Sequence, residues 1–333
     1  MNSKRIVLAV RPKGLPSKDT FREETFELQP LIDGQVVVES MYISVDPYMR
    51  GRLNDQKSYV APYEIGTAIT GGVIGRIIES KSVKYQVGDI VLAGYGWQTH
   101  SVEMDEQVRL IDPSIAPVTT ALGVLGMTGL TAYFGLLDIG KPQKGETIVV
   151  SAAAGAVGMI VGQIAKIHGA HVVGIAGSQA KCEYLTKQLH FDASVNYRDA
   201  SFKELLQGAC PNGVDVYFDN VGGDVSDVVL RMINRGARIA VCGQIAHYNE
   251  EKPHISTPIP SLLLINSAMM QGFTVGNYAT RFEEGIAALA TWLAQGKLKY
   301  EETITNGFDY VIDSFLMLFK GENTGKLLVK VND

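Results

Sequence analysis

One segment, residues 148–158, constrains the fold of this 333-residue chain more than any other. It reads Ile-Val-Val-Ser-Ala-Ala-Ala-Gly-Ala-Val-Gly, an apolar run that leads into small residues and then into a run with helical spacing. This order predicts a buried strand, a tight turn and a helix. Strand-like and helical runs alternate from about residue 120 onward, which is typical of an α/β fold with a parallel, doubly wound sheet. The strand-like runs are 147–152, His171–Ala176, Val214–Asp219 and 238–242.

The turn in this segment has the glycine spacing of a dinucleotide-binding motif. Ala153, Gly155 and Gly158 occupy its three positions, with alanine in place of the first glycine. Glycine at 155 lets the backbone approach a pyrophosphate, glycine at 158 lets the helix pack on the sheet, and the helix start offers free N–H groups to phosphate. An ordinary tight turn is the alternative, but the strand before it and the helix after it favour nucleotide binding. The predicted phosphate-binding residues are Gly155, Ala156, Val157 and Gly158.

The end of the second strand indicates which nucleotide binds. A chain built for NAD carries Asp or Glu there, hydrogen-bonded to the ribose, whereas this chain continues Gly-Ser-Gln-Ala-Lys over residues 177–181. Ser178 can donate a hydrogen bond to a 2′-phosphate, and Lys181 can neutralise it. Tyr197 and Arg198 follow the next strand and complete the predicted pocket. NADP(H) is therefore the predicted cofactor, and the alternative is that Lys181 is only a solvated helix residue.

Charge and hydropathy argue against several classes of partner. Thirty-five acidic residues against 30 basic ones give a net charge of −5, so nucleic acid is not the expected partner. The uncharged stretches 113–137, 147–165 and 253–280 are interrupted by glycine, proline, serine or threonine, which predicts buried core rather than membrane spans. The first residues do not read as a signal peptide, and we expect a cytoplasmic protein.

A catalytic zinc ion is not expected, because the sequence lacks a set of ligands for one. The three cysteines are Cys182, Cys210 and Cys242, and His100 is the only histidine in the first 160 residues. A catalytic zinc site needs three protein ligands of the Cys, His, Asp or Glu type brought together. The sequence therefore predicts no metal.

Five stretches along the chain carry a family resemblance. They are 44–52 (Ser-Val-Asp-Pro-Tyr-Met-Arg-Gly-Arg), 125–133 (Leu-Gly-Met-Thr-Gly-Leu-Thr-Ala-Tyr), 154–158, 217–223 (Tyr-Phe-Asp-Asn-Val-Gly-Gly), and Gly325-Lys326 preceded by Asn323. In residues and order the chain resembles the zinc-free prostaglandin reductase and curcumin reductase group of the medium-chain dehydrogenase/reductase superfamily. Thr128 departs from the proline usual at its position. The resemblance implies a GroES-like β-barrel catalytic domain, residues 1–120 and 299–333, around an inserted Rossmann NADP-binding domain, residues 121–298.

The resemblance also implies cofactor contacts beyond the glycine turn. Asn220 is one of them, and it closes the strand Val214–Asp219 at the carboxyl end, where ligands gather in α/β sheets. Asp219 and the glycines that follow are expected to shape that turn. A homodimer through the sheet edge is implied as well, with 272–275 as the candidate edge strand. Besides the glycine turn, the implied contacts are Lys181, Tyr197, Asn220, Cys242, Gly243, Gln244, Ile245, Tyr248, Phe273, Thr274, Val275 and Asn323.

Hydride transfer to an electron-poor carbon is the simplest chemistry for a nicotinamide enzyme without a metal or a nucleophilic triad. An enone or enal suits it, because charge then develops on the carbonyl oxygen and a hydrogen-bond donor can stabilise that charge. We expect Tyr248 to be the proton donor or enolate stabiliser and Tyr48 to hold the substrate. The alternative interpretation is that both tyrosines only pack.

The expected substrate is a small hydrophobic unsaturated carbonyl compound. Its apolar pocket wall is predicted at Pro258, Ile259, Pro260 and Leu263. Two other functions remain open for this sequence. One is a quinone oxidoreductase with the same cofactor, and the other is a non-enzymatic NADPH-binding protein.

Overall fold

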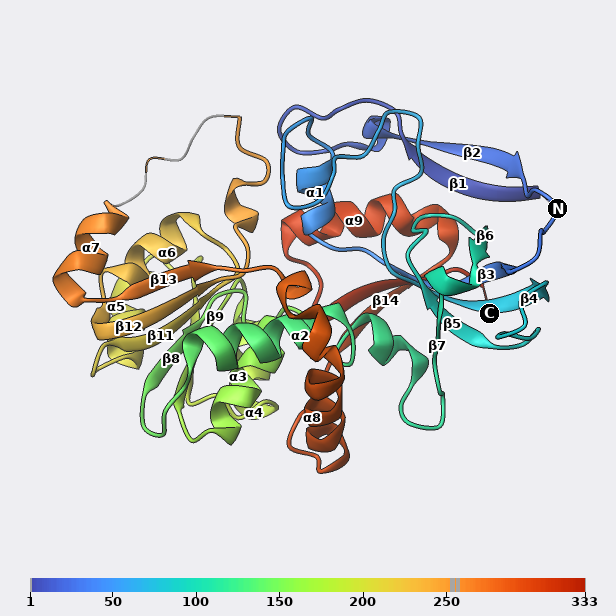
Figure 1. Cartoon of the computed structure of the whole chain (residues 1–333). Coiled ribbons are helices and arrows are strands. Elements are labelled where there is room, and N and C mark those ends of the chain that lie inside the picture. The colour runs from blue at the N-terminus through green and yellow to red at the C-terminus, as the bar shows by residue number, and fades with distance from the viewer. Residues whose placement is uncertain (1, 252–254, 256–257, 333) are drawn as a thin grey trace. The chain divides into compact units, whose positions relative to one another are not determined.

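The computed structural model describes residues 2–251, 255 and 258–332. It divides into two compact units (Figure 1). One comprises Met1–Leu122, Glu302–Asn323 and Leu327–Asp333, and the other comprises Gly123–Glu301 and Thr324–Lys326. The first boundary follows Leu122 rather than residue 120, and the second follows Glu301 rather than residue 298.

The first unit is built on antiparallel strands around β3 (Gln35–Ser44). Along one side β3 pairs with β4 (Val73–Ser80), and along the other it pairs first with β6 (His100–Met104) and then with β15 (Lys326–Lys330). The register of β3 on β4 shifts twice, and such irregularities bend a strand and increase its twist. A bent strand that exchanges partners curls its sheet as a small barrel requires.

The other elements of the first unit extend or cover this sheet. α9 (Val311–Lys320) places Phe315 against Trp97 with ring centroids 5.4 Å apart, and both side chains are fully buried. The C-terminal helix therefore belongs to the core of the first unit. The remaining elements are the paired strands β1 (Asn2–Leu8) and β2 (Phe21–Glu27), the sheet strands β5 (Ile90–Ala93), β7 (Arg109–Leu110) and β14 (Glu302–Asn306), and the short helix α1 (Tyr48–Arg52).

The second unit is built on a six-stranded sheet (Figure 1). Its strands are β8 (Thr147–Val150), β9 (His171–Ala176), β10 (Ala193–Asn196), β11 (Val214–Asp219), β12 (Ile233–Val241) and β13 (Met269–Gly272). All neighbours pair in parallel, in the order β10-β9-β8-β11-β12-β13. The strand order therefore reverses between β8 and β11, as in a Rossmann fold. The predicted doubly wound sheet is confirmed.

Helices cover both faces of this sheet, because successive strand side chains point to opposite sides. Val150 and Phe218 are buried on one face, and Val149 and Tyr217 on the other. The first face packs against α2 (Met127–Phe134), α3 (Gly158–Ile167), α4 (Gln179–Lys187) and α8 (Phe282–Ala294), and the second against α5 (Phe202–Ala209), α6 (Gly223–Leu230) and α7 (Ile259–Asn266).

The strand predicted at 272–275 was placed wrongly. The edge strand is β13, which ends at Gly272 and pairs with β12 over its four residues. The chain leaves the sheet at Phe273, whose ring packs against Phe218 with centroids 6.2 Å apart. Thr274 then starts a 3-10 turn, and its N–H donates to Oδ1 of Asn277 at 2.9 Å. Packing and capping at these two residues override their strand-like composition.

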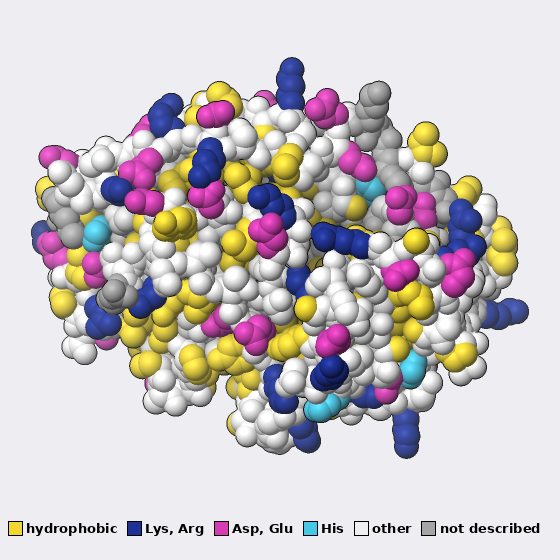
Figure 2. Space-filling model, turned by 180° about the vertical axis from the view of Figure 1, so that it is seen from behind, with side chains coloured by type: hydrophobic (Ala, Val, Ile, Leu, Met, Phe, Trp, Pro, Cys, Tyr) yellow, Lys and Arg dark blue, Asp and Glu magenta, His cyan; other side chains and the backbone are white. Residues whose placement is uncertain are grey.

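Charged side chains of both signs are interspersed on the face shown in Figure 2. This distribution agrees with the small net charge of the sequence. Among the residues that the structure describes, no helix has both the length and the apolar character needed to cross a membrane.

Candidate cofactor and active site

The glycine turn between β8 and α3 is shaped by backbone contacts that leave no room for a side chain at Gly158 and little at Gly155. A Cβ atom on Gly158 would lie 2.4 Å from the carbonyl oxygen of Ala152, and one on Gly155 would lie 3.1 Å from the same oxygen. The N–H of Ala153 donates to the carbonyl oxygen of Ile175 at 2.9 Å, which ties the turn to β9. The turn is thus the close, backbone-lined cradle that a pyrophosphate needs at a helix start. It contains the predicted residues Gly155, Ala156, Val157 and Gly158.

A distant segment of the chain lies against this turn. The N–H of Gly325 donates to the carbonyl oxygen of Ala154 at 2.8 Å. Gly325 has φ +68°, and a Cβ there would lie 1.9 Å from the carbonyl oxygen of Glu301, so only glycine fits. Asn323, a predicted cofactor contact, precedes Gly325 by two positions. The packing role of Gly325 was not predicted, although the residue was part of the family pattern.

The predicted 2′-phosphate residues come together where β9 and β10 end. Ser178 is the N-cap of α4, and its hydroxyl accepts the N–H of Lys181 at 3.3 Å. The ring of Tyr197 packs over Gly177, with Cε1 3.0 Å from where a Cβ would stand. Burial, and then the positive charge of Arg198, lower the pKa of Lys181 below its usual value. Lys181 and Arg198 thus place two positive charges near each other, which is a suitable site for a doubly charged phosphate.

The ends of β8, β11 and β12 are joined by hydrogen bonds at the same edge of the sheet. Nδ2 of Asn220 donates to the carbonyl oxygen of Ser151 at 2.8 Å, and the N–H of Asn220 donates to Oγ of Ser151 at 2.9 Å. The N–H groups of Cys242 and Gly243 donate to the carbonyl oxygen of Asp219 at 2.8 and 3.1 Å. This edge is the topological switch point, where dinucleotides bind in such sheets. The part played by Ser151 was not predicted from the sequence.

The buried carboxylate of Asp219 shapes the turn after β11. It accepts the N–H groups of Val221 and Gly222 at 2.9 and 3.0 Å. It also accepts the hydroxyl groups of Tyr217 and Ser226 at 2.9 and 2.7 Å. With its oxygens used in this way, Asp219 has the turn-shaping role expected from the sequence.

Tyr248 lies at the end of the turn that follows β12. Residues Ile245–His247 form a 3-10 turn, and the phenol oxygen of Tyr248 folds back to accept the N–H of Gln244 at 3.5 Å. A Cβ on Gly243 would lie 3.4 Å from that oxygen. Burial raises the pKa of Tyr248, so the phenol keeps its proton at neutral pH. The phenol is therefore held as a hydrogen-bond donor beside the predicted cofactor residues Cys242, Gly243, Gln244 and Ile245.

The predicted contacts after β13 have structural roles of their own. Besides Phe218, the ring of Phe273 packs edge-on against Tyr278, with centroids 6.4 Å apart. Thr274 caps the following turn, and Val275 packs against the core that α2 and α8 share. The side chain of Phe273 therefore serves the core.

Tyr48 belongs to the first unit, at the start of α1. Burial, and then the negative charge of Asp46, hold the pKa of Tyr48 well above its usual value, so this phenol is also protonated. The carboxylate of Asp46 accepts the hydroxyl of Ser44. Arg50 donates to Oδ1 of Asn54 at 2.8 Å and so fixes the loop.

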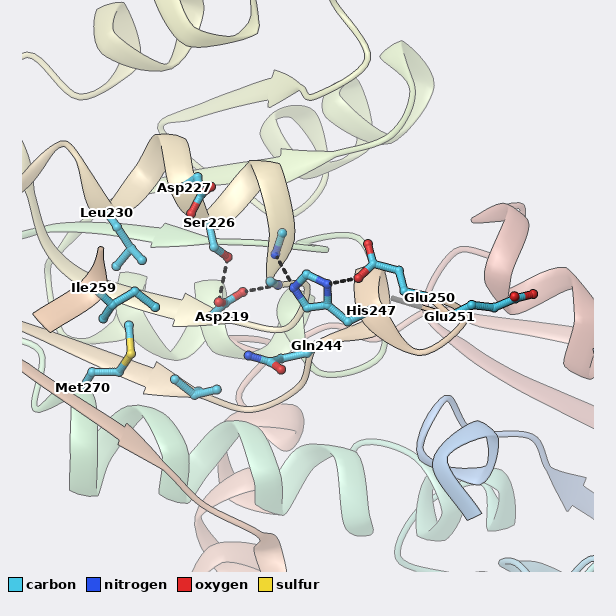
Figure 3. Close-up of a pocket in the computed structure, with 13 residues that line it drawn as sticks. Asp219, Ser226, Asp227, Leu230, Gln244, His247, Glu250, Glu251, Ile259 and Met270 are labelled. Carbon is cyan, nitrogen blue, oxygen red and sulfur yellow. Dashed lines mark hydrogen bonds and ion pairs between the residues drawn. The ribbon is translucent and has the colours of Figure 1, made fainter. Parts of the chain in front are cut away.

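A pocket of about 490 Å³ opens beside the turn that follows β12 (Figure 3). Ile259 and Met270 contribute apolar side chains to it, and Gln244 and Asp219 contribute polar groups. Of the predicted apolar wall, Ile259 lines this pocket, whereas Pro258 and Pro260 are exposed.

Metal ligands do not gather in the parts of the chain that the structure describes. Within those ranges, no three side chains of the His, Cys, Asp or Glu type are placed to hold an ion together. Cys182, Cys210 and Cys242 are free thiols. Burial raises the pKa of Cys242 to about 12, which keeps its thiol protonated at neutral pH.

Comparisons with known proteins agree with this architecture. A family model described as the N-terminal domain of oxidoreductase matches residues 4–111, and one described as zinc-binding dehydrogenase matches residues 156–291. YfmJ of Bacillus subtilis is 53% identical over 100% of this chain and 98% of its own length. The NADPH-dependent curcumin reductase of Escherichia coli is 43% identical over 99% of this chain and 97% of its own.

A solved structure extends the agreement to the fold. The CurA–NADPH complex of Vibrio vulnificus is 41% identical and superposes with a TM-score of 0.95 over 99% of both chains. Prostaglandin reductase 1 from cattle is also similar along 95% of this chain. The chain therefore belongs to the medium-chain dehydrogenase/reductase superfamily, in the group of NADP-dependent oxidoreductases that includes curcumin reductase and prostaglandin reductase 1.

Proposed function

We propose that this chain catalyses the NADPH-dependent reduction of the carbon–carbon double bond of α,β-unsaturated aldehydes and ketones, without a metal ion. The observation that carries the proposal is the Tyr248 phenol, protonated and placed where the turn after β12 joins the sheet edge that holds Asn220. A donor at that position can stabilise charge that develops on a substrate oxygen. The names of the relatives, which are reductases, support the direction of the reaction.

The residues of the second unit fit NADPH. The backbone cradle at 155–158 would take the pyrophosphate, since a Cβ at Gly158 would occupy that close turn. Ser178, Lys181, Tyr197 and the neighbouring Arg198 would hold the 2′-phosphate. When bound, NADPH supplies the hydride that reduces the β-carbon of the substrate.

The chain itself would supply charge stabilisation and orientation. Tyr248 would donate a hydrogen bond to the substrate carbonyl oxygen, a bond that strengthens as that oxygen gains enolate character. Tyr48, the second protonated phenol, would hold the substrate in position. The α-carbon of the enolate then takes a proton, which Tyr248 or solvent provides.

A panel of electron acceptors tests this function. We expect steady-state NADPH oxidation with enals and enones and none with the matched saturated aldehydes and ketones, and we expect saturated carbonyl compounds as products. A higher kcat/KM for simple quinones would replace the proposal by a quinone oxidoreductase. NADPH binding without turnover of any acceptor would replace it by a non-enzymatic NADPH-binding protein.

A further inference from the structure

The turns that follow β11 and β12 are fastened to one another by backbone groups and by one side chain. The N–H of Ala246 donates to the carbonyl oxygen of Val221 at 3.0 Å. The N–H of Gly223 donates to Nε2 of His247, also at 3.0 Å (Figure 3). Because Gly223 is the first residue of α6, the imidazole links the start of that helix to the 242–248 turn.

The two ring nitrogens of His247 have different partners. Nε2 accepts a hydrogen bond from Gly223, so it must carry a lone pair. Nδ1 lies 2.8 Å from Oε2 of Glu250, which is an acceptor, so Nδ1 must carry the proton. The geometry therefore selects the neutral imidazole in its Nδ1–H form, and Glu250 fixes that form.

A protonated imidazole would not suit this arrangement. Its Nε2–H would face the N–H of Gly223 at 3.0 Å, and its positive charge would stand at the N-terminus of α6, where the helix dipole disfavours cations. The charged groups that line the pocket around the ring are carboxylates, which favour a protonated ring, so the Gly223 N–H and the helix start are the features that oppose it. The carboxylates are Asp219 at the end of β11, Asp227 on α6, and Glu250 and Glu251 after the turn.

We propose that His247 is a positioning residue, whose imidazole, oriented by Glu250, holds the 242–248 turn against α6 and thereby sets the place of the Tyr248 phenol. The proposal rests on the function assigned above to Tyr248. Tyr248 is the next residue in the chain, and its phenol oxygen returns to the N–H of Gln244 in the same turn. The ring also packs on backbone, since a Cβ on Gly222 would lie 3.1 Å from Cδ2 of His247.

Two amide substitutions separate the roles of the two ring nitrogens. In His247→Gln the amide oxygen reaches the place of Nε2 and can accept the Gly223 N–H, whereas the shorter side chain of His247→Asn stays near Glu250. We expect the rate of single-turnover reduction to stay within about threefold in His247→Gln and to fall about tenfold in His247→Asn, because the Gly223 N–H then loses its acceptor. The affinity for NADPH should likewise change little in His247→Gln and fall in His247→Asn. His171→Gln, the same change at the amino end of β9, is the matched control and should be neutral.

The tautomer is measured directly by ¹⁵N NMR of the imidazole in the protein free of substrate and cofactor. We expect a protonated Nδ1 and an unprotonated Nε2 in the wild type. A protonated Nε2, or equal losses in His247→Gln and His247→Asn, would overturn the proposal. Measurements of the tautomer and of NADPH affinity use no unsaturated carbonyl compound. A failure of the proposed reaction with enones is therefore distinguishable from a failure of the role proposed for His247.

Discussion

At the scale of single residues, the surroundings of Lys181 favour the binding of an anion. Burial and the neighbouring Arg198 lower the pKa of Lys181, so keeping this lysine charged costs free energy in the cofactor-free protein. A bound 2′-phosphate would offset that cost by attracting the ammonium group of Lys181. The preference for NADPH is therefore expected to depend on this lysine.

Lys181→Ala should weaken NADPH binding by about 1–3 kcal/mol, the scale of a charge-assisted hydrogen bond, and leave NADH binding nearly unchanged. Lys187→Ala is the matched control, since Lys187 lies on the same helix and pairs with Glu183 at the surface. Fluorescence titration with both nucleotides measures the effect. Equal losses for NADPH and NADH would show that Lys181 does not read the phosphate.

Tyr248→Phe should lower the rate of hydride transfer about 10²–10³-fold while changing substrate affinity little, because the lost bond strengthens only as charge develops. Tyr48→Phe should mainly raise KM. Single-turnover kinetics of the two variants separate these effects. Since burial raises the pKa of Tyr248, its phenol stays protonated as pH rises toward its usual value, and the wild-type rate should show no loss from this group below about pH 10. A Tyr248→Phe rate within twofold of the wild type would remove this residue from the mechanism.

At the scale of elements, the glycine turn is a part of the site that tolerates little change at Gly158. A methyl group at Gly158 would collide with backbone atoms of the turn, which cannot move aside by a change of rotamer as a side chain can. The helix α3 and the strand β8 are therefore held at a separation that one substitution can alter.

Gly158→Ala should lower the free energy of unfolding by about 1–3 kcal/mol through overpacking and should weaken NADPH binding as well. Gly208→Ala is the control, because Gly208 lies in α5 with nothing within 4 Å of its Cβ position. There alanine should be neutral or stabilising, as helix propensity favours it. Thermal unfolding with and without NADPH measures both effects. A Gly158→Ala protein as stable as Gly208→Ala would contradict the packing argument.

Elements of the sheet were predictable where the pattern is local. β9 and β11 have the predicted bounds, because each is a compact run of strand-forming residues closed by a turn. The strand near 272 was misplaced, since the packing of Phe273 on Phe218 is a long-range contact that composition does not show.

The candidate site likewise contains residues that a local sequence rule predicts and contacts that no local rule predicts. Lys181 and Ser178 follow from the rule for what stands at a strand end. By contrast, the bond from Gly223 to His247 joins residues 24 positions apart, and the bond from Gly325 to Ala154 joins residues farther apart still. Such contacts depend on the folded chain, and no spacing in the sequence encodes them.

At the scale of the whole molecule, α7 and β13 leave apolar surface uncovered. β13 is an edge strand, and α7 has no buried residue, although its composition is apolar. Leu264 and Ile265 are 81% and 76% exposed. Exposed apolar surface next to an open strand edge favours association with a second copy across a two-fold axis.

We therefore predict a homodimer with twice the 36.1 kDa mass of the chain. Ile265→Lys should shift the protein toward the monomer, because it places a charge on the uncovered helix. Val83→Lys, at an exposed apolar position of the first unit, should leave the mass unchanged. Light scattering at micromolar concentration measures both. A wild-type protein that stays at 36.1 kDa would rule out the dimer.

The position of the transferred hydrogen tests the central claim, reduction of the carbon–carbon double bond, most directly. The measurement is a single turnover of a bound enone with NADPH deuterated at the transferable hydrogen, followed by NMR of the product. We predict deuterium on the β-carbon and a solvent-derived proton on the α-carbon of a saturated ketone. Deuterium on the carbonyl carbon of an alcohol would contradict the account.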